Sequence, residues 1–458
     1  GKSTFHFDLQ HYPELNQADL ERIQSSYNMN FSGFYSINRQ EGLGAEFVVV
    51  KKNPQTPVTD SFILNPNEYF QTHPNPNIHP PRYLPVSAVA QPSQATANVQ
   101  DILFGEATFN IEFYDPYLYH TAQVNQHPYT LTANYTVPFG LWLAENQLGT
   151  AGYKTLLNRE KDLQMPHLFQ LEPYQPNKKI IIMIHGLASS PETWISLTNN
   201  IMGDANLRDH YQVWQLFYST NMPIFESRYQ IQSLINQAFA QVEPNSPSAR
   251  DAVLIGHSMG GVISRLLISD TDISAQALPL MNYEQHTQML RNPVIRERFV
   301  FQPLKPVSRA VFIAAPHRGT EFADRWFTNL AKKLVVLPQS FFNEVNIHFH
   351  NQNSSTQGLV QSGPADLSRH ARFMMLTANV MPTSLVPYHS IIGNSTQSTD
   401  PAKMSDGIVP YNSSHLAGAI SEKVVTGGHS IHETPTVIME LRRILTSHLQ
   451  QADRVIQK

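Results

Sequence analysis

Short apolar runs alternate with helical stretches along this chain from about residue 111 onward. The runs are KKIIIMI (178–184), YQVWQLFY (211–218), AVLI (252–255), AVFIAA (310–315), HSIIG (389–393) and EKVVTG (422–427). Continuous apolar runs of this length are typical of strands that are buried on both faces. Strands that alternate with helices form a mostly parallel sheet with helices on both faces. The sequence therefore predicts an α/β fold.

The last helical stretch has the clearest pattern. Thr434 stands at the expected N-cap position and Pro435 in the first turn, and both positions suit these residues. The apolar residues that follow fall on one helical face. They are Val437, Ile438, Leu441, Ile444, Leu445 and Leu449.

Residues 1–110 differ from the rest of the chain. The pattern favours a helix that begins near Asp19 and carries Leu20, Ile23 and Tyr27 on one face. Extended segments are expected at EFVVV (46–50), SFIL (61–64) and ATFNIEFY (107–114). The Pro- and Asn-rich stretch 72–85 argues against both a regular helix and a central strand. We expect a loop-rich, partly β accessory region at 1–110, favoured as a structural cover, and a catalytic domain at 111–458.

One motif stands at the end of a predicted strand. The run AVLI leads into Gly256-His257-Ser258-Met259-Gly260, and a helical pattern follows. A strand, G-x-S-x-G and a helix together predict a nucleophile elbow, in which a strained turn raises the serine hydroxyl above the sheet edge. Glycines flank the serine because larger side chains would collide there. The alternative is a simple glycine-rich turn.

A serine nucleophile needs a base, and the base needs an acid that orients it. In this architecture the chain order is nucleophile, acid, histidine. SDGIVP (405–410) offers Asp406, although an ordinary Asp-Gly turn is the alternative. GGHSIHETP (427–435) offers His429 and His432. His429 is the expected base because it directly follows the glycine pair, and His432 is expected to support or cap.

When a serine attacks a carbonyl carbon, the tetrahedral intermediate carries a negative oxygen that needs an oxyanion hole. His185 and Gly186 end the run IIIMI, and Leu187 follows them. The backbone N–H groups of Leu187 and Met259 are the expected donors. His185 is expected to fix the loop.

Most of residues 180–458 resembles the bacterial lipase-like α/β-hydrolases, and is most similar to exported or lipoprotein-type enzymes of that group. The matching segments are IIIMIHGLASSPETW (180–194), YQVWQLFYSTNMPI (211–224), LIGHSMGGVISRLL (254–267), VFIAAPHRGTEFAD (311–324), YHSIIGN (388–394), SDGIVPYNSSHLAGAISEKVV (405–425) and GHSIHETPTVIMELRRIL (428–445), with LTANYTVPFGLWLAEN (131–146) before the core. The resemblance implies an α/β-hydrolase fold. It also implies a triad of Ser258, Asp406 and His429, with Leu187 and Met259 as the oxyanion hole.

The segment APHRG (315–319) resembles the Thr-Pro-His-x-Gly signature of many lipases, with Ala315 in place of the threonine. His317 is therefore carried over only as a residue next to the site. His185, Gly186, His257 and His432 are also expected beside the site.

Two segments are longer than a crossover connection requires. Residues 271–306 and 316–386 are expected to be lid-like insertions or walls of an acyl pocket. The amphipathic stretch 327–345 suits a lid helix and a core-packed helix equally well. NIHFH (346–350) has two histidines but is weak evidence for a metal site, and no metal or other cofactor is expected.

Composition excludes some classes of protein. The chain has 458 residues, 41% of them hydrophobic and 15% charged, with a net charge of −4. Its lysine pairs are isolated, so a nucleic-acid partner is not expected. The start at Gly1 indicates that a signal peptide, a lipoprotein leader or a tag was removed, and the absence of cysteine favours an exported bacterial protein, periplasmic or membrane-anchored. Peripheral membrane contact is therefore also expected.

These patterns predict a serine hydrolase that cleaves carboxylic esters of lipid or acyl type through an acyl-enzyme. A phospholipase, an amidase or an acyltransferase would use the same triad. A non-catalytic binding protein on a hydrolase fold is the alternative of a different class.

Overall fold

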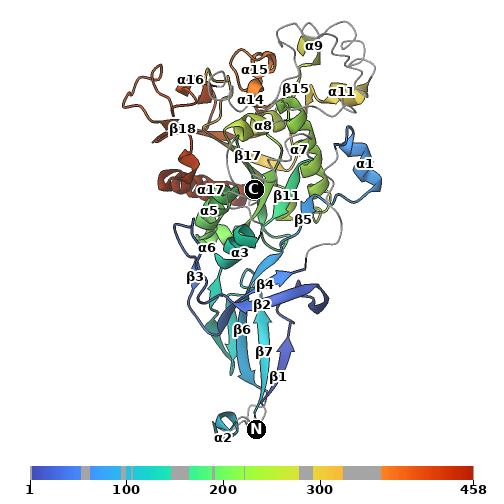
Figure 1. The fold of residues 1–458 in the computed structure, drawn as a ribbon, viewed down its shortest axis with the longest axis vertical. Coiled ribbons are helices and arrows are strands. Elements are labelled where there is room, and N and C mark those ends of the chain that lie inside the picture. Colours follow the sequence, from blue (N-terminus) through green and yellow to red (C-terminus); the bar gives the residue numbers. More distant parts are fainter. Residues whose placement is uncertain are drawn as a thin grey trace.

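The structure is a computed structural model that describes residues 3–52, 62–93, 99–104, 107–145, 165–187, 191–220, 222–277, 292–322 and 363–456. The molecule is elongated (Figure 1). A five-stranded sheet forms the narrow lower part, with the N-terminus at its tip. A larger sheet covered by helices forms the upper part.

The larger sheet has eight strands in the order β19-β18-β17-β14-β12-β13-β11-β5. Their bounds are β5 Ile78–His79, β11 His167–Gln170, β12 Lys179–Ile184, β13 Tyr211–Phe217, β14 Ala252–His257, β17 Val307–Ile313, β18 Tyr388–Asn394 and β19 Ser421–Thr426. All neighbouring pairs are parallel except β11 and β13. The six apolar runs all form strands of this sheet. The short strands β5 and β11 were not predicted.

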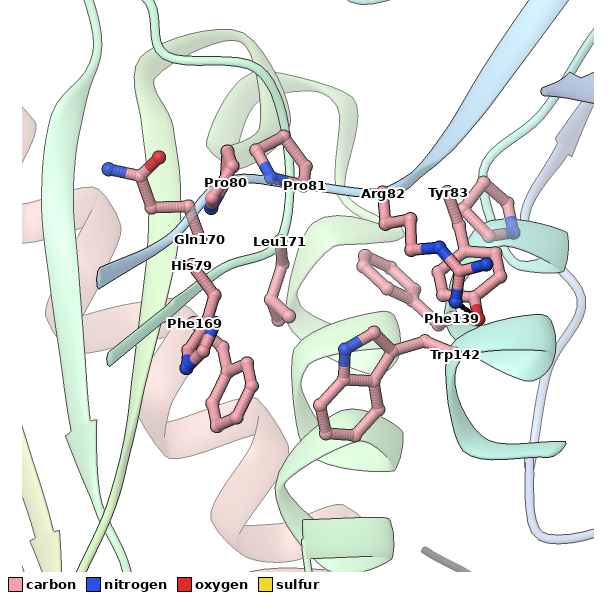
Figure 2. A pocket seen from close by; sticks show the side chains of 11 residues that line it. His79, Pro80, Pro81, Arg82, Tyr83, Phe139, Trp142, Phe169, Gln170 and Leu171 are labelled. Atoms are coloured by element: carbon pink, nitrogen blue, oxygen red, sulfur yellow. Dashed lines mark hydrogen bonds between the residues drawn. The ribbon is translucent and has the colours of Figure 1, made fainter. Parts of the chain in front are cut away.

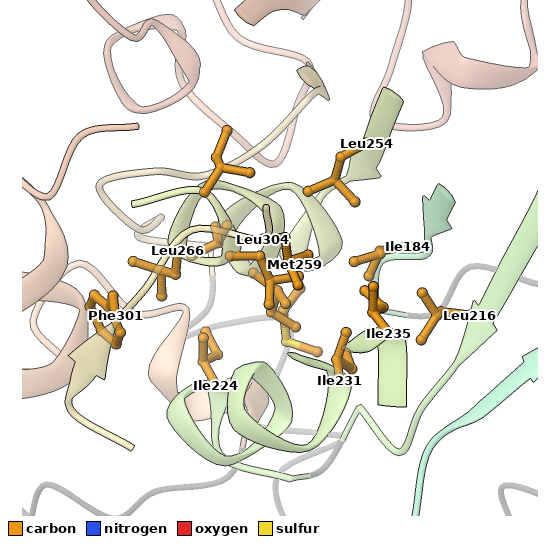
Figure 3. Close-up of a cluster of buried hydrophobic side chains, with 14 of the residues drawn as sticks. Ile184, Leu216, Ile224, Ile231, Ile235, Leu254, Met259, Leu266, Phe301 and Leu304 are labelled. Atoms are coloured by element: carbon orange, nitrogen blue, oxygen red, sulfur yellow. The ribbon is translucent and has the colours of Figure 1, made fainter. Parts of the chain in front are cut away.

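Helices cover both faces of this sheet. Helices α5 (Pro191–Met202), α6 (Ala205–His210) and α17 (Pro435–Ile456) pack on one face, against alternate residues such as Ile181 and Val253. Helices α7 (Ile224–Phe239) and α8 (Met259–Leu267) pack on the other face, against Ile182 and Leu254. Figure 3 shows part of this second core, with Met259 near Ile231 and Ile235 of α7. The predicted α/β fold is confirmed, and so is the apolar stripe of the last helix, which is buried throughout.

The N-terminal sheet has the order β1-β7-β6-β4-β2. Its strands are β1 Thr4–Asp8, β2 Leu20–Ser25, β4 Ala45–Lys51, β6 Tyr83–Pro92 and β7 Thr108–Tyr114. Smaller elements lie near it: η1 Gln17–Asp19, β3 Arg39–Gln40, α2 Val99–Leu103, β8 Thr121–Val124, β9 His127–Thr130, β10 Ala133–Asn134 and α3 Val137–Glu145. Helix α1 (Pro66–Thr72) instead lies beside α7 in the upper part of the molecule (Figure 1). The partly β character of the N-terminal region is confirmed. Its division at residue 110 from the predicted catalytic domain stays a prediction.

Two expectations for short segments of the N-terminal region were wrong. The helix expected from Asp19 is a short 3₁₀ turn followed by strand β2, because Leu20–Ser25 pairs with β4 and this tertiary pairing overrides the helical spacing. Residues 62–64, from the expected strand 61–64, lie in no strand. Residue 61 lies outside the described residues.

The expectation that the Pro-rich stretch 72–85 contains no central strand was also wrong, because Pro85 lies in β6, in the middle of the N-terminal sheet. At Pro85, β6 pairs with β4 alone, since its pairing with β7 begins at Ser87. The proline therefore stands at a local sheet edge, where the loss of its N–H is tolerated.

The two sheets meet at a seam that contains a small pocket of about 100 Å³ (Figure 2). Aromatic side chains of α3 and β11 line it, among them Trp142 and Phe169. His79 also lines it and stacks on Phe169, with the ring centroids 4.6 Å apart. Arg82 lines it too, and its guanidinium donates to the Lys51 carbonyl, the Tyr83 hydroxyl and Glu21. No residue of the predicted catalytic triad lines this pocket.

The described parts of the two insertions form short elements. They are β15 Thr271–Asp272, α9 Ser274–Ala277, α11 Pro293–Glu297, β16 Val300–Phe301, α14 Gly363–Asp366 and α15 Arg372–Thr377. The stretches 327–345 and 346–350 lie outside the described residues. Within the described ranges, no helix has the length and apolarity to cross a membrane.

Candidate functional site

The predicted catalytic residues follow four strands of the eight-stranded sheet. Ser258 follows β14, and Leu187 comes shortly after the neighbouring β12. Asp406 and His429 follow β18 and β19. Because β12, β14, β17, β18 and β19 run parallel, their carboxyl ends meet at one edge, where ligands bind in open α/β sheets.

Ser258 occupies a strained turn between β14 and α8. Its φ is 54° and its ψ is −124°, a conformation that costs free energy for a residue with a side chain. The turn is held by the bond that the Ser258 N–H donates to the Ile313 carbonyl, with an N···O distance of 2.9 Å. Ser258 precedes the first residue of α8, so the positive end of the helix dipole faces the hydroxyl. The predicted elbow geometry is present.

Close backbone approach explains two glycines beside the serine. A Cβ added to Gly186 would lie 2.5 Å from the Ser258 Cβ and 2.8 Å from the His257 carbonyl oxygen. A Cβ added to Gly256 would collide with Ser264 of α8. The absence of these side chains lets two segments pack directly against the elbow. One is α8, and the other is residues 185–187, which carry the expected donor Leu187 and are called the oxyanion loop below.

The structure brings Ser258, His429 and Asp406 into one hydrogen-bonded chain. The His429 Nε2 lies 2.8 Å from the Ser258 Oγ, and its Nδ1 lies 2.8 Å from the Asp406 Oδ2. A carboxylate only accepts, so the Nδ1 carries the proton and the Nε2 is free to accept from the serine hydroxyl. The three side chains thus have the connectivity of a nucleophile, a base and an orienting acid.

Asp406 is buried, and its second oxygen is also bonded. The Oδ1 accepts from the N–H groups of Ile408 and Val409, at 2.8 and 2.6 Å. The Asp-Gly turn that was the alternative for this residue exists, since Gly407 has a φ of +92°. The turn and the site role are therefore compatible, because the turn aims the carboxylate at His429.

The two expected oxyanion donors lie beside the elbow. Met259 is the first residue of α8, so its N–H has no partner within the helix. Leu187 directly follows Gly186, whose backbone packs on Ser258. Among the described residues, neither N–H donates a hydrogen bond.

His185 fixes the loop that carries Leu187. Its Nδ1 donates to the Gly186 carbonyl at 2.9 Å, and its Nε2 accepts from the Tyr218 N–H at 3.4 Å. The Tyr218 hydroxyl in turn donates to the His185 carbonyl. Burial lowers the pKa of His185 to about 4, so the ring is neutral, as both bonds require. The contribution of Tyr218 was missed, because its partner is a backbone carbonyl.

His432 lies behind the catalytic chain rather than in it. Its side chain is 2% exposed, and burial lowers its pKa to about 3. Its ring packs against the His257 ring in a tilted arrangement, with the centroids 3.8 Å apart. Within the described part of the chain, neither of its ring nitrogens forms a hydrogen bond. His429, not His432, contacts Ser258.

The APHRG segment is joined to residues 413–415 by hydrogen bonds to its backbone and from its Arg318 side chain. The Ser414 and Ser413 hydroxyls donate to the carbonyls of Ala315 and Gly319, at 3.0 and 2.6 Å. Arg318 donates to the His415 carbonyl at 2.8 Å. These partners were missed, because serine donors to backbone carbonyls leave no sequence signature.

His317 is fully buried, and its ring nitrogens contact no hydrogen-bonding partner among the described residues. Burial and the nearby Arg265 and Arg318 lower its pKa well below the usual value. It makes none of the bonds of the Ser258–His429–Asp406 chain. Over the described ranges, no group of three or more His, Asp or Glu side chains could hold a metal ion.

A model of the alpha/beta hydrolase family matches residues 181–441. Among solved structures, the chain is similar to the mature lipase BlEst2 of Bacillus licheniformis, at 16% identity and a TM-score of 0.35, covering 60% of this chain and 98% of that one. It is similar to Staphylococcus hyicus lipase at 16% identity and a TM-score of 0.37, covering 61% and 97%. It is also similar to the metagenomic carboxyl esterase MGS0156 at 14% identity and a TM-score of 0.31, covering 56% and 65%. Comparison with curated proteins gives no match.

The family model spans more than half of the chain. The chain belongs to the alpha/beta hydrolase family.

Proposed function

We propose that this protein is a serine hydrolase that cleaves carboxylic esters, of lipid or other acyl type. The observation that carries the proposal is the chain of two 2.8 Å contacts from Asp406 through His429 to Ser258. A buried carboxylate, an imidazole in the matching tautomer and a serine at a strained elbow are the parts that acyl transfer requires.

In the proposed reaction, the Ser258 Oγ attacks the ester carbonyl carbon while the His429 Nε2 accepts the hydroxyl proton. The carbonyl oxygen becomes an oxyanion, which the N–H groups of Leu187 and Met259 stabilise. The C–O bond to the alcohol then breaks, and His429 returns the proton to the departing alcohol. Asp406 stabilises the imidazolium throughout.

Water completes the cycle. His429 takes a proton from a water molecule, whose oxygen attacks the acyl-enzyme carbonyl. The bond to Ser258 breaks, the serine recovers its proton, and the carboxylic acid is released. No step requires a metal or an organic cofactor.

The test is labelling with a fluorophosphonate, followed by peptide mass spectrometry. The label is expected on Ser258 and absent from a Ser258→Ala variant that melts at the wild-type temperature. Turnover of nitrophenyl esters from acetate to palmitate, with analysis of the products, defines the acyl preference and separates hydrolysis from acyl transfer. A folded wild-type protein that neither labels nor turns over any ester would refute the proposal.

A further inference from the structure

His257 lies next to three parts of the proposed catalytic machinery. It is the residue before Ser258, and its Nε2 lies 3.0 Å from the His429 carbonyl oxygen. A Cβ added to Gly186, next to the oxyanion donor Leu187, would lie 3.1 Å from the His257 Nδ1. One side chain thus lies between the nucleophile, the base and the oxyanion loop.

The partners of His257 define its proton. A carbonyl oxygen only accepts, so the Nε2 carries the hydrogen and donates to His429. Burial, together with the neighbouring His432 and His429, lowers the pKa of His257 well below the usual value. The ring is therefore neutral, with a bare Nδ1 toward the Gly186 backbone.

His432 supports this ring from the other side. Its ring packs against the His257 ring, with the two planes tilted by 32°, and its centroid also lies 5.8 Å from that of the Trp194 ring. All three side chains are at most 2% exposed. The His257 ring is thus held by packing, and its one donor is committed to the backbone of the catalytic base.

We propose that His257 is a positioning residue that sets the place of His429 relative to Ser258 by donating to the His429 carbonyl. The inference rests on the proposed function. The His429 backbone follows two glycines, Gly427 and Gly428, that leave the loop few side-chain contacts of its own. The bond from His257 supplies a fixed point where that loop passes the elbow.

The test compares three substitutions at His257. Phenylalanine keeps a ring but removes the donor. Glutamine carries an amide N–H near the position of the Nε2, whereas asparagine is too short to place one there. We expect His257→Phe and His257→Asn to lower kcat by about 10²-fold, the cost of a misplaced catalytic group, with little change in KM. His257→Gln should recover most of that loss. The rate of fluorophosphonate labelling should follow kcat.

His448 provides the matched control. It is also buried, and its Nε2 also donates to a backbone carbonyl, that of Asp251, at 2.9 Å. Asp251 precedes β14, so this bond lies at the opposite edge of the sheet from Ser258. His448→Phe should lower the melting temperature but leave kcat per folded molecule unchanged.

Two results would overturn the inference alone. One is a folded His257→Phe or His257→Asn variant with wild-type kcat. The other is a His257→Gln variant that is as impaired as the other two. A wild-type protein that neither labels nor hydrolyses esters would instead overturn the proposed function, and this inference with it.

Discussion

Gly186→Ala should lower kcat strongly in a protein that still folds. The added Cβ would lie 2.5 Å from the Ser258 Cβ, whereas ordinary contacts begin at 3.4 Å. The loop must therefore retreat from the serine by about 0.9 Å, and the Leu187 N–H retreats with it. Loss of one oxyanion donor costs about 3–4 kcal/mol of transition-state stabilisation, so kcat should fall by about 10²–10³-fold. The KM should change little, because the ground-state ester carbonyl depends less on this donor.

The assay is steady-state hydrolysis of a nitrophenyl ester, combined with thermal melting of the same samples. Gly428→Ala is the control, since its added Cβ would meet only the Asp406 carbonyl oxygen at 3.7 Å, an ordinary contact. It should retain nearly all of the wild-type kcat. A second check uses Ser258→Gly, which removes the Ser258 Cβ, the atom nearest to the Cβ that Gly186→Ala adds. The destabilisation caused by Gly186→Ala should be smaller in that background, as a double-mutant cycle would measure.

A Gly186→Ala enzyme that is folded and within an order of magnitude of wild-type kcat would refute this reasoning. Either the loop would have another way to accommodate a Cβ, or the Leu187 N–H would not bind the oxyanion.

Further predictions concern the acid, the base and the response to pH. Asp406→Asn should lower kcat by about 10⁴-fold with unchanged folding, because an amide favours the wrong tautomer of the base, as kinetics and melting curves would show. His429→Ala should abolish turnover and His432→Ala should have a mild effect; the reverse ranking in the same assay would assign the base to His432. Burial lowers the pKa of His389 and His448 to about 4, from 6.5. The unfolded chain therefore binds protons that the folded chain does not, so stability is complete above pH 6.5 and falls toward pH 4, by about 3 kcal/mol for each histidine. Melting temperatures across this range should show a shallower decline for His448→Gln than for the wild type, and an equal decline would contradict the assignment.

The sequence was most informative where local pattern and tertiary structure agree. An apolar run such as IIIMI needs no partner information to be identified as a buried strand, and the final helix has its cap, proline and stripe within one segment. The elbow is also local, since strand, glycines, serine and helix are contiguous. These features identified the sheet and placed Ser258 at its edge.

Prediction failed where distant residues decide the conformation. Leu20–Ser25 has helical spacing but pairs with β4, and Pro85 lies in a central strand at a point where only one neighbour is present. The choice between His429 and His432 likewise depends on which ring reaches Ser258. A glycine pair suggested that choice, and the 2.8 Å contact provides a geometric reason for it.

The strand order explains why the APHRG segment accompanies this site although His317 does not take part in the hydrogen-bonded chain. β17 lies between β14, which leads into Ser258, and β18, which precedes Asp406 in the chain, so its loop must span the gap between them. The loop does this through hydrogen bonds. Its backbone carbonyls accept from the Ser413 and Ser414 hydroxyls. The Thr320 hydroxyl donates to the Ile408 carbonyl, in the turn that carries Asp406. Ala315 meanwhile packs on α8, close enough that a Cβ on Gly261 would lie 2.5 Å from its Cβ. The segment therefore joins the serine helix to the acid turn, and small residues there follow from the closeness of the two.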